Sequence, residues 1–167
     1  ALPDAGGTLW KYGSEPKANE EAADYDKLNT FWSTTDVATL EGLGNVEEWT
    51  RAWAAESVLG DDDGYVCCAH NFYLYDHPSE GILFLPWDFD DTLDIAPFDS
   101  DPESGYGHGL FQQSIYLAVL RDPGWHEVYV SEVEAMNAAM DPDVRLAELS
   151  TWDAQIADAV AADTLRT

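Results

Sequence analysis

The stretch His70–Asp91, HNFYLYDHPSEGILFLPWDFDD, constrains the fold of this 167-residue chain more than any other. Two apolar, aromatic-rich runs, Phe72–Tyr75 and Ile82–Trp87, flank a DHPSEG connector that is rich in turn-forming residues. This pattern predicts a β-hairpin with a loop of several residues. Polar residues enter and leave the hairpin at its open end. The sequence therefore predicts that an amide and several carboxylates meet at one end of a short sheet.

The polar residues at this end are of the types that bind a hard divalent cation. Asn71 enters the hairpin, and Asp88 and Asp90 leave it. Asp63 lies in the GDDDGY turn just before the hairpin. In phosphoryl transfer, one carboxylate orients the acceptor hydroxyl, while an amide and a second carboxylate hold the metal that binds the nucleotide phosphates. The structural alternative is a solvated Asp61–Asp63 turn, an Asn71 that satisfies local backbone, and an Asp88 that caps the next segment.

The rest of the chain predicts mainly helices. Apolar residues recur at helical spacing over about 24–33, 46–59, 110–121, 123–139 and 142–163, with Ser150-Thr151 as a candidate break in the last. Leu9, Trp10 and Tyr12 form a candidate strand, and residues 94–109 form a Pro/Gly/Asp-rich loop that is long enough for a functional insertion or lid. We predict one domain over residues 1–167, of the α+β class and mostly α, with several helices around a central β-hairpin.

The acidity of the chain limits its partners. It has 33 acidic and 7 basic residues, a formal net charge of −26, so the phosphates of nucleic acids would be repelled. The simplest explanation is a solvated surface adapted to high salt or to a calcium-rich medium, and a specific cationic partner is the alternative. No signal peptide opens the chain, and no apolar run approaches the length of a membrane span. We expect an extracellular or cell-surface location.

The two cysteines, Cys67 and Cys68, are adjacent in the sequence, and neither has a partner at CxxC spacing. An ordinary disulfide between neighbours is sterically awkward. We therefore predict two small buried side chains, which leave the redox compartment open.

Three motifs together resemble the spore coat protein H (CotH) family of atypical protein kinases. They are Asp63-Gly64-Tyr65, His70-Asn71-Phe72-Tyr73-Leu74-Tyr75 and Leu85-Pro86-Trp87-Asp88-Phe89-Asp90. They are similar to the family's D-x-Y turn, N-x-Y-L-Y strand and P-W-D-x-D motif. The segments VEEWTRAWAAESVLG, LWK and RDPGWHEVYVSEVEAM resemble further parts of the family. The resemblance thus spans nearly the whole chain.

This resemblance implies a kinase-like C-terminal lobe that binds ATP through Mg²⁺ or Mn²⁺ and transfers phosphate to a Ser/Thr-type hydroxyl of a protein substrate. Asp63 would be the catalytic aspartate, with Asp62 as the alternative register of the acidic run. Asn71 and Asp88 would bind the metal and the nucleotide, and Asp90 would be a further metal ligand. His70 is interpreted as structural.

Kinase chemistry also needs an element that covers the phosphates and a basic residue that contacts them. The chain has three lysines, Lys11, Lys17 and Lys27, and no glycine-rich segment precedes them. Either such an N-terminal lobe lies upstream in a longer precursor, or this copy has lost catalysis, and we expect weak or no kinase activity from the isolated chain. Two other functions stay open: a non-catalytic acidic module whose aspartate clusters bind Ca²⁺, and a pseudokinase that binds ATP without turnover.

Overall fold

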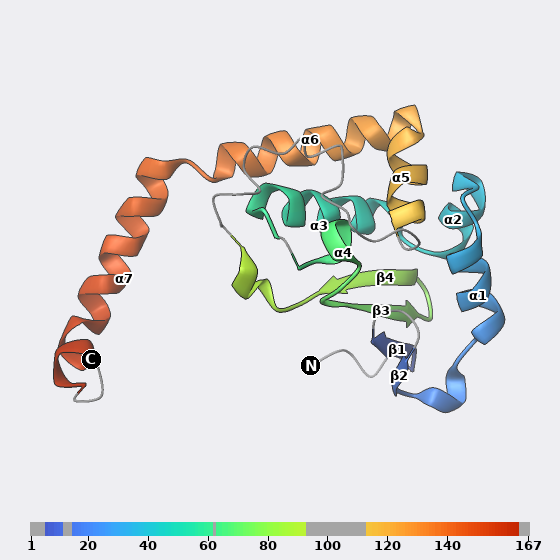
Figure 1. Ribbon diagram of the computed structural model, residues 1–167, viewed down its shortest axis with the longest axis horizontal. Helices are drawn as coiled ribbons and strands as arrows, with labels where there is room; N and C mark the ends of the chain where they lie inside the picture. Colours follow the sequence, from blue (N-terminus) through green and yellow to red (C-terminus); the bar gives the residue numbers. More distant parts are fainter. Residues whose placement is uncertain (1–5, 12–14, 62, 93–112, 164–167) are drawn as a thin grey trace.

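The computed structural model describes residues 6–11, 15–61, 63–92 and 113–163. Tyr12, Asp62 and the predicted 94–109 loop lie outside the described residues. The fold is α+β and mostly α, as predicted (Figure 1). The strands are β1 (Thr8–Lys11), β2 (Glu15–Ala18), β3 (Phe72–His77) and β4 (Gly81–Pro86). The helices are α1 (Tyr25–Ser33), α2 (Val37–Leu43), α3 (Val46–Leu59), α4 (Tyr65–Cys68), α5 (Gln113–Arg121), α6 (Pro123–Ala139) and α7 (Pro142–Ala162), with 3₁₀ turns η1 (Glu20–Ala22) and η2 (Phe89–Asp91).

The predicted hairpin is present, and it belongs to a four-stranded antiparallel sheet of order β2-β1-β3-β4. Strands β3 and β4 pair in unbroken register from Phe72 opposite Pro86 to His77 opposite Gly81. Gly81 closes the turn with φ 73°, a left-handed conformation that glycine adopts without a Cβ clash. The register fixes the open end of the hairpin, where Asn71 precedes β3 and Asp88 follows β4.

Strand β2 is the element of the sheet that the sequence did not predict. Its four residues, EPKA, lack alternating apolar positions, and most of them are exposed. The strand pairs only with β1 and forms the edge of the sheet. An edge strand tolerates proline and charge because one side of its backbone faces solvent. A strand of this kind needs no periodic hydrophobic pattern, so the sequence contains no sign of β2.

Aromatic side chains from α3, α4 and the hairpin form the centre of the core. Trp49 and Trp53 of α3 are fully buried, and their rings lie 5.9 and 5.4 Å from the ring of Phe84 in β4. The Tyr65 ring stacks on Trp53 at 5.7 Å and lies 4.6 Å from Phe84. Large aromatic surfaces dominate the energy of such a core. This packing fixes α4 between α3 and the hairpin.

Helix α3 has the boundaries that the sequence predicted. The Asn45 side chain accepts a hydrogen bond from the backbone N–H of Glu48 at 3.0 Å, and so caps the first turn. Gly60 ends the helix in the left-handed conformation, with φ 61°. The chain consequently leaves α3 directly into the acidic turn.

Helix α6 packs along the face of α3 opposite the sheet, and α5 stands roughly perpendicular to α6 at its N-terminal end (Figure 1). A chain of hydroxyl hydrogen bonds joins the three helices: Tyr116 donates to Tyr129 at 3.3 Å, and Tyr129 donates to Ser57 at 2.7 Å. All three side chains are buried. Burial of these hydroxyls is tolerated because each has a partner.

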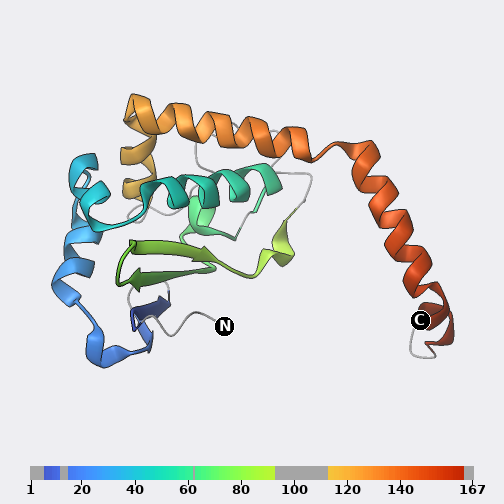
Figure 2. The same ribbon diagram turned by 180° about the vertical axis from the view of Figure 1, so that it is seen from behind.

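Helix α7 turns sharply away from α6 and extends away from the rest of the molecule (Figures 1 and 2). The predicted break at Ser150-Thr151 is wrong, since the helix is continuous there. Both hydroxyls donate to backbone carbonyls one turn earlier, Ser150 to Leu146 at 2.8 Å and Thr151 to Ala147 at 2.9 Å, so they are satisfied within the helix. Among the described helices, none is both long enough and apolar enough to cross a membrane.

Candidate functional site

Asp61 and Asp63, in the acidic turn after α3, differ in their exposure to solvent. Asp61 is 1% exposed, and its Oδ1 accepts a hydrogen bond from the backbone N–H of Asp63 at 3.2 Å. The Asp63 side chain is 41% exposed. A solvated turn is therefore the wrong description for Asp61, which is a buried acceptor. Asp63, by contrast, is presented at the surface.

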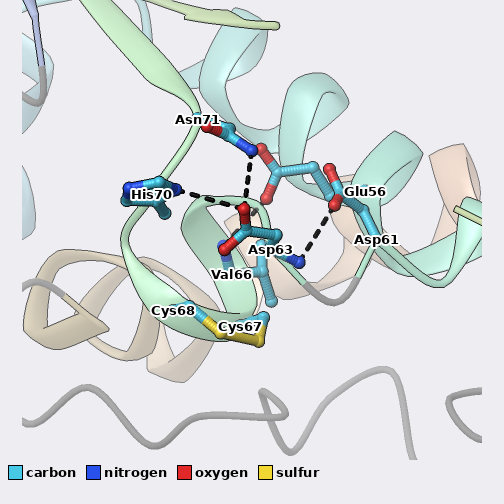
Figure 3. The surroundings of a disulfide bond; sticks show 8 residues. All are labelled: Glu56, Asp61, Asp63, Val66, Cys67, Cys68, His70 and Asn71. Carbon is cyan, nitrogen blue, oxygen red and sulfur yellow. Dashed lines mark hydrogen bonds and ion pairs between the residues drawn. A yellow bond between two sulfur atoms is a disulfide. The ribbon is translucent and has the colours of Figure 1, made fainter. Parts of the chain in front are cut away.

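Two polar residues at the entry to β3 hold the Asp63 carboxylate in place. Its Oδ2 accepts a hydrogen bond from Asn71 Nδ2 at 2.9 Å and lies 3.2 Å from His70 Nδ1 (Figure 3). Asn71 is buried, whereas the His70 side chain is 48% exposed. The structure thus brings together Asp63 and Asn71, as the order of motifs suggested, and it adds His70 as a direct neighbour of the same oxygen.

The exit from β4 lies beside the entry to β3. The backbone N–H of Trp87 donates to the carbonyl of Asn71 at 2.9 Å, which extends the hairpin by one bond. Asp88 follows with φ 61°, and Asn71 has φ 47°. Left-handed backbone costs non-glycine residues free energy, and such conformations concentrate at functional sites. Two of them, Asn71 and Asp88, lie at this end of the hairpin.

Asp88 and Asp90 are exposed at the start of η2. No hydrogen bond in the described part of the chain joins either carboxylate to Asp63 or Asn71, and no group of three His, Cys, Asp or Glu side chains there has the geometry of a metal site. The oxygens nevertheless suit Mg²⁺, which takes one or two carboxylates and completes its shell with water and phosphate. The Asn71 amide directs its nitrogen at Asp63 (Figure 3).

Glu56 is a buried acid behind the turn that the sequence analysis did not single out. It is 2% exposed, and its Oε2 accepts a hydrogen bond from the backbone N–H of Val66 in α4 at 2.8 Å. Burial, reinforced by the nearby negative charge of Asp61, raises the pKa of Glu56 to about 8. Its place in the sequence was the signal for its burial. Glu56 lies three residues after Trp53 and seven after Trp49, on the apolar face of α3.

Gly64 lies between the two buried acids. A Cβ at this position would lie 2.7 Å from Asp61 Oδ2 and 2.9 Å from Glu56 Oε2. Both side chains are buried and cannot move aside freely. The glycine of the Asp63-Gly64-Tyr65 motif is therefore required by the close approach of the carboxyl groups.

We expect the free energy of unfolding to fall as the pH rises from about 5 to 8. Over this window the folded chain keeps a proton on Glu56, whereas the unfolded chain, with a pKa near 4.5, has lost it. Glu56→Gln resembles the neutral acid and removes this titration. The substitution should reduce the slope by up to about 1.4 kcal/mol per pH unit and leave stability near pH 5 close to wild type. Urea denaturation at several pH values measures both quantities.

Glu47→Gln is the matched control, because it removes one charge from an exposed position of the same helix. This variant should keep the wild-type slope. Burial also raises the pKa of Glu48, to about 7, so part of the slope below pH 7 should survive in Glu56→Gln. A slope above pH 7 that Glu56→Gln leaves unchanged would contradict the assignment.

The prediction for the two cysteines is wrong about their pairing, although Cys67 is buried as predicted and Cys68 is half-buried. Cys67 and Cys68 are bonded to each other on α4, between Asp63 and His70 (Figure 3). The argument that adjacent cysteines are poorly placed for a disulfide applies to bonds that join separate elements. Cys67 and Cys68 are instead linked across the single peptide bond between them. The disulfide therefore lies within the connection that joins the acidic turn to the hairpin.

No protein-family model matches the chain, and no characterised protein matches its sequence. Function must therefore be inferred from the side chains themselves.

Proposed function

We propose that this chain carries the acceptor-orienting and metal-binding part of a phosphoryl-transfer site similar to that of CotH kinases, with ATP as donor and a protein hydroxyl as acceptor. The observation that carries the proposal is the hydrogen bond from the Asn71 amide to the Asp63 carboxylate at 2.9 Å. In protein kinases, the catalytic-loop aspartate accepts the proton of the substrate hydroxyl, and an asparagine of the same loop binds metal. Asp63 and Asn71 have the side chains and the proximity for these roles, and the Asp63 carboxylate is exposed to an acceptor.

In this scheme, Asp63 orients the acceptor hydroxyl and takes its proton. His70 Nδ1 and Asn71 Nδ2 both contact Oδ2 of Asp63, so the other carboxylate oxygen is left to meet the substrate. The Asn71 amide oxygen and the Asp88 carboxylate would hold Mg²⁺ or Mn²⁺, with Asp90 as a further ligand. When bound, the metal neutralises the phosphate charge. Positioning supplies most of the rate in such a reaction, and the short hairpin is a rigid support for it.

Asp88→Asn should weaken the binding of ATP in the presence of Mn²⁺ by at least about tenfold, because the variant removes a charged metal ligand. Calorimetric titration of ATP with and without Mn²⁺ measures the metal-dependent part of the affinity. Asp91→Asn is the control, since it removes the same charge from the 3₁₀ turn that Asp88 precedes. Phosphate transfer is then assayed on the chain and on the chain with any sequence that adjoins it, because the isolated chain is expected to be weak.

Three results would contradict the proposal. Calcium binding without any affinity for ATP would favour an acidic module that uses metal for stability. Metal-dependent ATP binding that Asp88→Asn and Asp91→Asn reduce equally would show that general acidity, and not the hairpin site, attracts the metal. Binding without transfer in every form of the protein would indicate a pseudokinase.

A further inference from the structure

The disulfide between Cys67 and Cys68 contributes little to the stability of the fold as a whole. Disulfides stabilise a protein mainly by closing a loop in the unfolded chain, and the effect grows with the number of residues in that loop. The two cysteines have a sequence separation of 1, so their bond closes the smallest loop that a chain allows. The bond therefore acts locally, on the backbone of α4.

This bond constrains the conformation of the one-turn helix α4. Adjacent side chains of an α-helix point about 100° apart around its axis and do not face each other. A disulfide needs the two Cβ atoms within about 3.5–4.5 Å of each other. The bond and a continuing regular helix are thus competing arrangements of this segment, and α4 ends at Cys68, where Ala69 takes φ 54°. Reduction to two thiols removes the constraint.

Helix α4 has a candidate functional residue on each side, Asp63 before it and Asn71 after it. The carbonyl of Gly64 accepts hydrogen bonds from the backbone N–H groups of Cys68 at 3.0 Å and His70 at 3.2 Å. These bonds join the turn that carries Asp63 to the segment that leads to Asn71 (Figure 3). A change in the backbone at Cys68 therefore alters the 2.9 Å hydrogen bond between Asn71 Nδ2 and Asp63 Oδ2.

The two halves of α4 differ in how firmly they are held. Tyr65 and Val66 are buried, and the backbone N–H of Val66 donates to Glu56 Oε2 at 2.8 Å. Cys67 is 4% exposed, whereas Cys68 is half-buried among the described residues. The first half of α4 is thus anchored in the core, and the second half can respond to a change at the disulfide. Cys68 is the cysteine that a thiolate from solution reaches more easily.

We propose that Cys67 and Cys68 form a redox-active disulfide that exchanges with a dithiol reductant, and that its state controls the contact between Asp63 and Asn71. One thiolate of the reductant attacks Sγ of Cys68, and Cys67 leaves as a thiolate that takes up a proton. The second thiol of the reductant loses its proton, attacks the mixed disulfide and releases Cys68, which is protonated in turn. Two electrons and two protons pass to the cysteine pair, and the reductant becomes a disulfide.

The regulatory consequence of this exchange rests on the proposed function, in which Asp63 meets the acceptor and Asn71 binds the metal. The bonded form holds these two side chains together and is the competent form. Reduction separates them and switches the site off. The exchange itself depends only on the two cysteines, so it is tested without any nucleotide.

Reduction of the folded chain tests the exchange. Dithiothreitol without denaturant, followed by alkylation, should add two alkyl groups to the mass of the chain. In Cys67→Ser, the Cys68 thiol should react with an aromatic disulfide reagent at least about tenfold faster than the Cys67 thiol does in Cys68→Ser, because exposure controls thiol reactivity. A disulfide that is reduced only in urea would overturn the proposal, and equal rates for the two thiols would overturn the order of attack.

The side-chain amide of Asn71 reports the contact with Asp63 directly. Its NMR signals should shift on reduction, and its protons should exchange with water at least about tenfold faster, because they lose a hydrogen-bond partner. The side-chain amide of Asn45, at the N-terminus of α3, is the internal control and should not change. Cys67→Ser combined with Cys68→Ser should give the reduced-state signals with or without dithiothreitol. Asn71 signals that are identical in both redox states of the wild-type chain would overturn the proposal.

Phosphate transfer separates this inference from the proposed function. The reduced protein should transfer phosphate at least about tenfold more slowly than the bonded protein, and dithiothreitol should not affect the double serine variant. Equal rates in the two redox states would overturn the regulatory role. If neither state transfers phosphate while the Asn71 signals still respond to reduction, the phosphoryl-transfer proposal fails and the redox control of the contact is supported.

Discussion

Asp63→Asn should lower the rate of phosphoryl transfer by about 10² to 10⁴-fold, the range that a positioned general base contributes. Asparagine has nearly the same shape, and its side-chain oxygen can still accept the hydrogen bond from Asn71. It cannot take the proton of an acceptor hydroxyl. The loss should therefore appear in kcat, with little change in the affinity for ATP in Mn²⁺.

The substitutions at Asp63 and Asp88 should therefore have different effects. Replacing Asp63 should lower kcat, whereas replacing Asp88 should weaken metal-dependent binding of ATP. The matched control is Asp62→Asn, because it removes an adjacent charge of the same acidic run and tests the alternative register. We expect Asp62→Asn to keep most of the activity. If Asp62→Asn abolished transfer while Asp63→Asn preserved it, the contact between Asn71 and Asp63 would be structural, and the catalytic assignment would move to Asp62.

The hairpin and the longer helices could be predicted because local patterns encode them. Apolar, aromatic-rich runs on both sides of a turn define β3 and β4, and the register follows from the loop between them. Asn45 and Gly60 define the ends of α3 through backbone hydrogen bonds that are local to the sequence. The meeting of Asp63 with Asn71 follows from the same locality, since only the one-turn helix α4 separates them.

Contacts made between elements could not be predicted. Glu56 looks like an ordinary helical glutamate, and its burial depends on α4 packing across it. Asp61 resembles its neighbours in an acidic run, although Gly64 and Glu56 enclose it. Strand β2 exists only because β1 pairs with it. In each case the decisive partner is another element, and a single sequence carries no signal for such pairing.

The environment of α7 could not be predicted from the sequence either. Its apolar residues at helical spacing would serve equally well in a core or in an interface, because periodicity identifies a face and not what covers it. In the described part of the structure, this face is exposed at Leu146, Leu149, Trp152 and Ile156.

Trp53→Ala should destabilise the chain by about 3–5 kcal/mol, the usual cost of truncating a buried tryptophan. The Trp53 ring is fully buried and lies 5.7, 5.4 and 5.5 Å from the rings of Tyr65, Phe84 and Tyr116. It thus joins α4, the hairpin and α5 to α3. Urea denaturation measures the change, and Trp152→Ala on α7 is the control. Trp152 is 55% exposed, so the control should shift stability by no more than about 0.5 kcal/mol.

Trp53→Phe separates the packing of this ring from its polar nitrogen. The Nε1 group of Trp53 is buried and has no hydrogen-bond partner among the described residues. A buried donor without a partner costs free energy, and phenylalanine removes that donor while it keeps an aromatic contact with Tyr65. The two effects oppose each other, so Trp53→Phe should cost at least about 2 kcal/mol less than Trp53→Ala. Equal losses in both variants would show that stability depends on the full shape of the indole ring. The packing of Tyr65, and with it the position of the turn that carries Asp63, would then depend on that shape too.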